Sequence, residues 1–177
     1  MAYADPATIQ ATDPGDPLSA AWCDQVRDNG EFFIDPPACS ISDMTGSSVP
    51  TATPTLLGGA STETFDNDSM HSTSSSQSRI TVQTPGRYLF MSTVTYASHA
   101  GADDSFLRVS LRVNGTTSYG GMQIKGQTAA SQAVRIQATR ALVLAAGDYV
   151  ETLVQHTLGG TVNPVTLDEM FCMFLTR

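Results

Sequence analysis

Apolar and polar residues alternate with a period of two from about residue 55 to the C-terminus, which is the pattern of half-buried β-strands. The clearest segment is FLRVSLRV at 106–113, where leucine and valine alternate with arginine and serine. YLFMSTVTY at 88–96 carries β-branched and aromatic residues on both faces and predicts another strand. Further strands are expected at 116–124, 131–144, 149–156 and in the terminal FCMFLTR.

Two turn signals divide these strands. Asn114-Gly115 follows the alternating segment directly and is the strongest short hairpin signal, because both residues tolerate the positive φ angles of a type I′ turn. Gly147-Asp148 separates two further apolar runs. Several short strands with turns at this spacing predict an all-β fold, an antiparallel jelly-roll sandwich.

The first 50 residues have a different pattern, which predicts an appendage to this domain. Residues 1–17 hold prolines and a glycine among polar residues, which favours an extended arm. After Asp35-Pro36-Pro37 the chain is rich in Ser, Thr and Pro, as in a linker. We therefore divide the chain into an N-terminal anchoring arm at 1–45, a linker at 46–54 and a jelly-roll domain at 55–177.

One helix is expected within the arm, at 19–29. Leu18, Trp22 and Val26 recur at every fourth residue and form a narrow apolar stripe, and Gly30 follows as a C-terminal stop signal. A helix this short is not stable alone, so the stripe must pack either on the chain's own C-terminal domain or on a partner. The arm residues that we expect to anchor the protein are Leu18, Trp22, Val26, Phe32 and Phe33.

The charge of the chain is unevenly distributed. Its formal net charge is −8, and residues 1–50 hold eight acidic residues against Arg27 alone, a net of −7. We expect no binding to nucleic acid or to an anionic membrane surface, and no apolar stretch approaches the length of a membrane-spanning helix. The acidic arm is either simply solvated or docks on a basic surface. MAYADPATIQ has neither the basic nor the apolar region of a signal peptide, so we expect no signal peptide here.

Candidate catalytic and metal-binding groups are sparse. His71, His99 and His156 lack the spacing of a zinc site, and the cysteines, odd in number and without ligand spacing, indicate reduced packing residues. Asp66 and Asp68 could supply oxygen ligands to calcium, although an Asx-rich turn explains the same residues. The sequence contains no GxSxG nucleophile motif and no glycine-rich phosphate loop before a helix. We therefore expect neither an enzyme nor a cofactor.

The jelly-roll segment resembles the tumour-necrosis-factor (TNF)/complement globular-head family. The motifs that carry this resemblance are, in order, Phe65-Asp66, RITVQTPGRYLF with its Pro85-Gly86-x-Tyr88-x-Phe90, LRVNG at 111–115, LVLAAGDYV and FCMFL. The resemblance covers about residues 55–177 and implies that three copies bury one sheet face around a threefold axis. The candidate trimer-interface residues are the aromatics Tyr88, Phe90, Tyr96, Tyr149, Phe171 and Phe174.

Residues 3–39, YADPATIQATDPGDPLSAAWCDQVRDNGEFFIDPPAC, separately resemble a segment of tailed-bacteriophage virion proteins, especially those of actinobacteriophages, where it precedes a similar head-like domain. This resemblance implies a location in the virion, after assembly in the bacterial host cytoplasm. We therefore expect a homotrimeric capsid decoration or head-fibre protein whose arm binds the major capsid protein. The alternative is a minor tail or tail-tip protein whose jelly roll binds a host-surface receptor or glycan.

Overall fold

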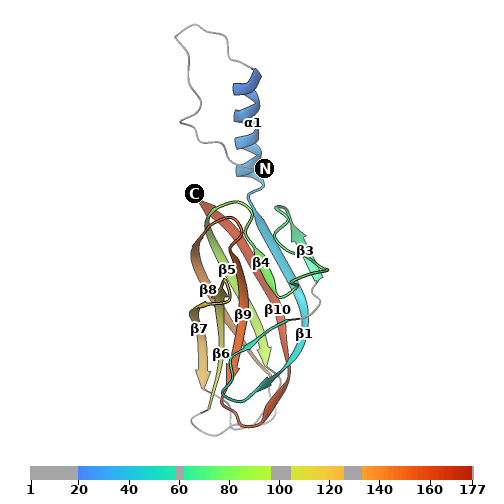
Figure 1. The fold of residues 1–177 in the computed structure, drawn as a ribbon, viewed down its shortest axis with the longest axis vertical. Helices are drawn as coiled ribbons and strands as arrows, with labels where there is room; N and C mark the ends of the chain where they lie inside the picture. The colour runs from blue at the N-terminus through green and yellow to red at the C-terminus, as the bar shows by residue number, and fades with distance from the viewer. Residues whose placement is uncertain (1–19, 59–61, 97–104, 126–132, 177) are drawn as a thin grey trace.

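The computed structural model describes residues 20–58, 62–96, 105–125 and 133–176. Two antiparallel β-sheets pack face to face, and one helix extends from an end of the sandwich (Figure 1). The last strand finishes at this same end (Figure 1). No helix within these four ranges is long and apolar enough to cross a membrane.

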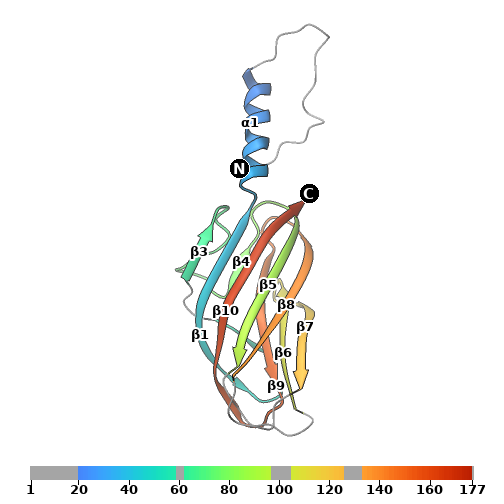
Figure 2. The same cartoon turned by 180° about the vertical axis from the view of Figure 1, so that it is seen from behind.

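The strand order confirms the predicted all-β jelly roll. The elements are α1 (Ala20–Ile34), β1 (Ala38–Pro50), β2 (Thr55–Leu56), β3 (Thr62–Asp66), β4 (Arg79–Thr81), β5 (Gly86–Tyr96), β6 (Phe106–Val113), β7 (Thr117–Lys125), β8 (Val134–Leu144), β9 (Tyr149–His156) and β10 (Thr161–Thr176). Sheet A has the order β3-β1-β10-β5-β8 and is seen from its outer side in Figure 2, whereas sheet B has the order β2-β9-β6-β7, with β4 also paired to β9. Most neighbouring strands are not consecutive in the chain, so the connections cross between the sheets.

The two predicted turns are present. Asn114 and Gly115, between β6 and β7, have φ angles of 51° and 67°, the left-handed values of a type I′ turn. The side chain of Asn114 accepts a hydrogen bond from the backbone N–H of Tyr149 (2.9 Å) and donates one to the carboxylate of Asp148 (2.8 Å). Gly147 has a φ of 90°, which glycine adopts without strain. The two turns are therefore tied to one another at one end of sheet B.

Apolar side chains of the alternating strands fill the space between the sheets. Leu107 and Val109 of β6 point inward and are at most 3% exposed. Tyr96 of β5 is fully buried, and its hydroxyl donates to the carbonyl of Arg108 at 2.6 Å and lies 3.2 Å from the carbonyl of Gln155. These carbonyls belong to β6 and β9, so Tyr96 links sheet A to two neighbouring strands of sheet B.

The β-domain begins earlier than the sequence pattern predicts. Residues 38–50, which that pattern assigns to the arm and linker, form β1 in sheet A between β3 and β10. The strand sequence ACSISDMTGSSVP has few large apolar residues, so its alternation is weak. It forms a strand because its backbone pairs with β10 from Ala38 opposite Met173 to Pro50 opposite Thr161. The division into an arm at 1–45 and a domain from 55 is therefore corrected to a domain that starts at β1.

Helix α1 is also longer than the predicted helix 19–29, because it continues from Ala20–Ile34 straight through Gly30. A glycine in a helix interior costs roughly 1 kcal/mol relative to alanine. Phe32 in the last turn is only 5% exposed and packs edge-on against Phe174, with ring centroids 5.1 Å apart. This packing against the domain offsets the glycine penalty, and the helix ends before Pro36, since a proline disfavours helix at the preceding residue.

The cysteines differ sharply in accessibility. Cys23 on α1 is exposed, whereas Cys39 and Cys172 are buried opposite one another on β1 and β10, and all three are free. Burial raises the pKa of the Cys172 thiol to about 12 and raises that of Cys39 even further above its usual range. The thiolate is the reactive form of cysteine, so both buried residues are expected to be inert in the folded protein.

We therefore expect one fast-reacting thiol per chain when the native protein is treated with an aromatic disulfide reagent, and three after unfolding in guanidinium chloride. Cys23→Ser should remove the fast reaction and leave the unfolded count at two. A second fast thiol in the native protein would mean that the β1–β10 pairing opens on the timescale of the reaction.

Candidate functional site

The outer face of sheet A is apolar over one part of its surface. On β5, Leu89 and Met91 point away from the core, and on β10 Phe171 and Met173 do the same. Met91 lies directly opposite Phe171, and Leu89 directly opposite Met173, so the four side chains form a compact block on two central strands. We call this the outer apolar face, and define it by Phe65, Leu89, Met91, Val143, Phe171 and Met173.

The edges of the block are more exposed than its centre. Val143 on β8 is 76% exposed, and Phe65 on β3 is 43% exposed. The ring of Phe65 packs edge-on against Phe171, with centroids 6.1 Å apart, and so extends the apolar surface across β1. Single exposed apolar residues are ordinary, but a set shared by the four strands β3, β5, β8 and β10 is typical of an interaction surface.

Polar residues border this face along the same strands. Thr93, two residues beyond Met91, is paired with Glu169 on one side and lies 3.5 Å from the side-chain nitrogen of Gln137 on the other. Ser40 donates to the carboxylate of Glu169 at 3.0 Å. An apolar centre with a hydrogen-bonded polar border is the usual composition of a protein–protein interface.

Three of the aromatics predicted to line a trimer axis are instead part of the core of the single chain. Tyr88, Phe90 and Tyr96 are 0% exposed between the two sheets. These side chains could contact another chain only if their own chain unfolded. The expectation that they line a trimer interface is therefore corrected. The physical reason is that β5 is apolar on both faces, and its sequence alone does not say which face points inward.

The other three predicted aromatics lie in three different places. Phe171 belongs to the outer apolar face, as described above. Phe174 points toward the core, where its ring packs edge-on against Tyr88 at 5.3 Å and also contacts Phe32 of α1. Tyr149 lies on sheet B, where Arg79 stacks on its ring. Of the six residues, only Phe171 is therefore positioned on the outer side of sheet A.

Sequence reasoning missed the aliphatic and thioether members of the face, Leu89, Met91 and Met173. A signal for them exists, because they occupy the positions between the aromatics in the two strands and share the opposite side of the sheet. Restricting the search to aromatics selected the wrong side of β5.

No protein-family model and no curated protein sequence matches this chain. Among solved structures, the globular domain of zebrafish complement 1qA is similar at a TM-score of 0.55 and 13% identity, over 80% of this chain and 98% of that one. The Eiger TNF of S. frugiperda is similar at a TM-score of 0.50 and 17% identity, over 80% of this chain and 94% of that one. The fold is a TNF/C1q-like jelly roll.

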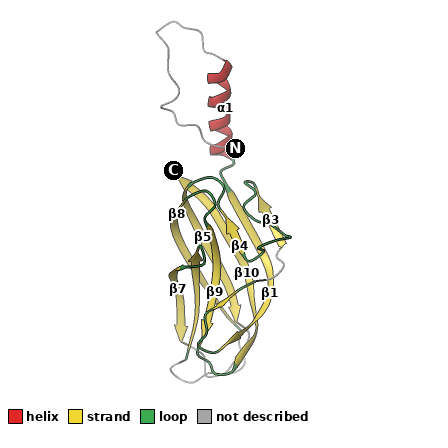
Figure 3. Ribbon diagram, viewed as in Figure 1, coloured by secondary structure: helices red, strands yellow, loops and turns green. Residues whose placement is uncertain are grey.

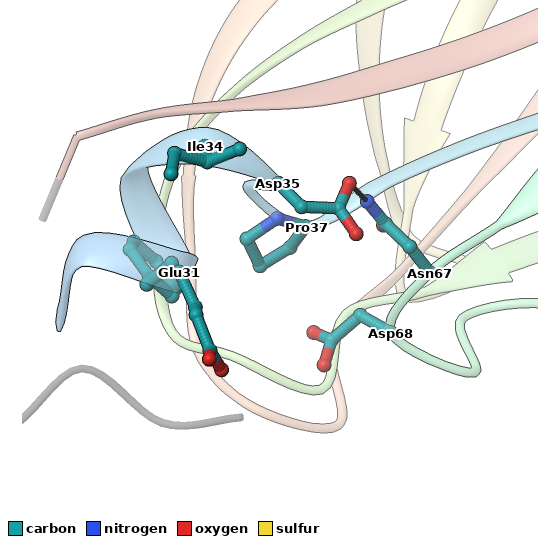
Figure 4. A pocket seen from close by; sticks show the side chains of 7 residues that line it. Glu31, Ile34, Asp35, Pro37, Asn67 and Asp68 are labelled. Atoms are coloured by element: carbon teal, nitrogen blue, oxygen red, sulfur yellow. Dashed lines mark hydrogen bonds between the residues drawn. The ribbon is translucent and has the colours of Figure 1, made fainter. Parts of the chain in front are cut away.

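Helix α1 is joined to this TNF/C1q-like jelly roll by Asn67, which follows β3. The side-chain nitrogen of Asn67 donates to Asp35 (2.6 Å) and to the carbonyl of Pro36 (2.9 Å), and its side-chain oxygen accepts from the backbone N–H of Ala38 (2.6 Å). Figure 4 shows this contact at one wall of a cavity of about 420 Å³, which is lined on its other sides by Glu31, Ile34 and Asp68 among others. The helix end is therefore anchored to the domain by both apolar and hydrogen-bonded contacts.

The neighbouring Asp66 organises the loop after β3 and is not free to bind a cation. One of its carboxylate oxygens accepts from the backbone N–H groups of Asp68 (3.2 Å) and Met70 (2.9 Å), and the other from that of His71 (2.8 Å). This is the Asx-rich turn that the sequence analysis weighed against a calcium site. Within the described ranges, no group of three or more His, Cys, Asp or Glu residues is placed to hold a metal ion.

The residues predicted to anchor the arm have different environments. Phe32 is buried against the jelly roll, so it is unavailable to a partner and this expectation is corrected. Val26 is 44% exposed, Phe33 is 72% exposed, and Trp22 is half-buried. Leu18 lies outside the described residues. Ile34, which sequence reasoning did not select, is 86% exposed beside Phe33 at the helix end.

Proposed function

We propose that this chain is a homotrimeric structural protein of a bacteriophage particle, and specifically a decoration or head-fibre protein of the capsid. The jelly roll trimerises through the outer apolar face of sheet A. The segment up to the end of α1 attaches the trimer to the major capsid protein. The observation that carries the proposal is the outer apolar face, because a partly exposed apolar surface on the central strands of a sheet, with exposed apolar residues at its edges, is typical of a binding surface.

Two lines of support favour a second and third copy of the same chain as that partner. Globular domains with this fold are typically trimeric. The four central side chains are also uncharged, so identical copies can bury them without burying a charge, whereas Arg87, opposite Val143, lies at the edge. Full burial of a large apolar side chain contributes about 1.5–3 kcal/mol, and each partly exposed side chain of this face would supply a share of that.

The virion location is supported by the resemblance of residues 3–39 to a segment of tailed-phage virion proteins. The geometry is compatible with attachment through the N-terminal segment, since α1 extends beyond the strands at one end of the jelly roll (Figure 3). The rest of the domain would then project away from the attachment point. Three arms on one trimer would bind a capsid with avidity, so each arm needs only weak affinity. Capsids provide threefold and quasi-threefold positions at which a trimer matches the lattice symmetry.

Copy number tests where in the particle the protein resides. Quantitative mass spectrometry of purified particles, calibrated against the major capsid protein, is expected to find tens to hundreds of copies in multiples of three. A few copies per particle would contradict head decoration and favour the minor tail or tail-tip alternative, in which the jelly roll binds a host-surface receptor or glycan. Absence from particles that are otherwise complete would refute both virion roles.

A further inference from the structure

A small polar cavity lies at the edge of sheet B, away from the outer apolar face. The loop after β3 and strand β4 enclose about 170 Å³. Most of its lining residues carry a hydroxyl group or a positive charge: they are Ser69, Ser72, Ser75, Ser76, Thr81 and Arg79, together with Met70, His71 and Gln83. No carboxylate lines it. Its contents must therefore accept hydrogen bonds and tolerate or carry negative charge.

Arg79 is held in place without being neutralised. Its guanidinium carbon lies 4.3 Å from the centroid of the Tyr149 ring, a stacked arrangement that fixes the guanidinium plane. The Nε atom of Arg79 is buried and has no hydrogen-bond partner among the described residues. Leaving a buried donor of a charged group unsatisfied costs at least about 1–3 kcal/mol. Because that atom is shielded from solvent, an anion in the cavity would be held by the two Nη groups of the same guanidinium.

The nearest acidic neighbour of Arg79 across the sheet is already engaged. Glu151 of β9 lies directly opposite Arg79 of β4, but its Oε2 accepts from both Nε (3.0 Å) and Nη2 (2.8 Å) of Arg112 on β6. Glu151 is 6% exposed, so this pair is well shielded from solvent. Arg108 also lies on this side of β6, so three arginines, Arg79, Arg108 and Arg112, stand with Glu151 among the described residues of this side of β4, β6 and β9. A negatively charged ligand is thus favoured locally even though the whole chain is acidic.

The loop that covers the cavity is fastened at several points. Ser72 Oγ accepts from the backbone N–H of Ser75 at 3.2 Å, and the backbone N–H of Arg79 donates to the carbonyl of Ser76 at 3.3 Å. Gln83 donates to the carbonyl of Ser69 at 3.1 Å and closes the other end. These hydrogen bonds hold the loop residues and Arg79 around the same cavity before any ligand binds, which lowers the entropic cost of binding.

We propose that this cavity binds one tetrahedral oxyanion, a phosphate or sulfate group, with Arg79 as the cation and serine and threonine hydroxyls as further donors. A free anion and an ester carried by a saccharide share the terminal oxygen atoms that such a site would bind, so both sources fit the proposal. A planar guanidinium donates two parallel hydrogen bonds to such a group, and this geometry is stronger than a single contact. The site lies on the sheet opposite the proposed trimer interface and does not depend on the proposed function.

Titration of the full-length protein with inorganic phosphate and with sulfate tests this proposal, using isothermal titration calorimetry against chloride at matched ionic strength. Saturable binding with one site per chain is expected. Arg79→Gln should weaken it at least tenfold. Arg140→Gln is the matched control, since Arg140 also stacks on a tyrosine ring, that of Tyr119 at 5.4 Å, yet lines neither described cavity. The Arg140→Gln variant should bind phosphate and sulfate with the affinity of the unmodified protein.

A second variant tests the site independently in case Arg79→Gln does not fold. Thr81→Val removes one cavity hydroxyl while keeping the cation and the side-chain volume, and should weaken binding several-fold with an unchanged melting temperature. Sulfated and neutral dextran distinguish the source of the anion. Binding of sulfated dextran that Arg79→Gln abolishes supports a polymer-borne ester, whereas binding of the free anions alone supports a small ligand. No saturable binding of either anion, or equal binding by Arg79→Gln, would overturn the site.

Discussion

Phe171→Asp is expected to convert the trimer into monomers at micromolar protein concentration. Phe171 lies at the centre of the outer apolar face, between Met91 and Phe65. Full burial of such a side chain contributes about 1.5–3 kcal/mol, of which the partly buried Phe171 supplies a share at the interface, and the new carboxylate would also have to be desolvated. Over three chains the association constant should fall at least about a thousandfold. Light scattering coupled to size-exclusion chromatography measures the mass directly.

Ser118→Asp is the control for Phe171→Asp, because Ser118 is exposed on β7 of sheet B and adds the same charge on the opposite side of the sandwich. This variant should remain trimeric. Circular dichroism should show that both variants keep the β-fold, since Phe171 does not point into the core. A trimer that survives Phe171→Asp would place the interface elsewhere, and a monomeric unmodified protein would refute trimerisation through this face.

Tyr96→Ala is expected to lower the free energy of unfolding by about 3–5 kcal/mol, the usual cost of deleting a large buried aromatic side chain. Tyr96 fills the space between the sheets and also links them through its hydroxyl. Tyr96→Phe keeps the ring and loses only the hydrogen bonds, which should cost about 1 kcal/mol. Guanidinium unfolding at one fixed protein concentration measures both values, because the stability of an oligomer depends on concentration.

The pair of Tyr96 variants also separates a core role from an interface role. In a core role, Tyr96→Ala destabilises strongly, and the folded fraction retains its oligomeric state. If Tyr96→Ala kept full stability but dissociated the trimer, Tyr96 would lie at the interface, as the aromatic pattern of the sequence suggested, and the assignment to the core would be wrong.

Local sequence patterns were reliable where one physical constraint dominates. The Asn114-Gly115 turn adopts the expected left-handed φ angles because few other residues tolerate them. The strand at 106–113 has a polar and an apolar side, so its register against the core follows from the alternation. The cavity around Arg79 could not be predicted in this way, since it depends on the stacking of Arg79 on Tyr149, a residue 70 positions away.

The sequence by itself determined the all-β class, the two turns and the presence of a helix before the domain, because these features depend on backbone preference and side-chain period. Only the tertiary structure decided that residues 38–50 form a strand, since that strand is held by pairing with β10 and not by its own apolar residues. It also decided which side of β5 is buried. Both faces of β5 are apolar, and the packing of sheet B against it leaves Tyr88, Phe90 and Tyr96 inside and Leu89 and Met91 available to a partner.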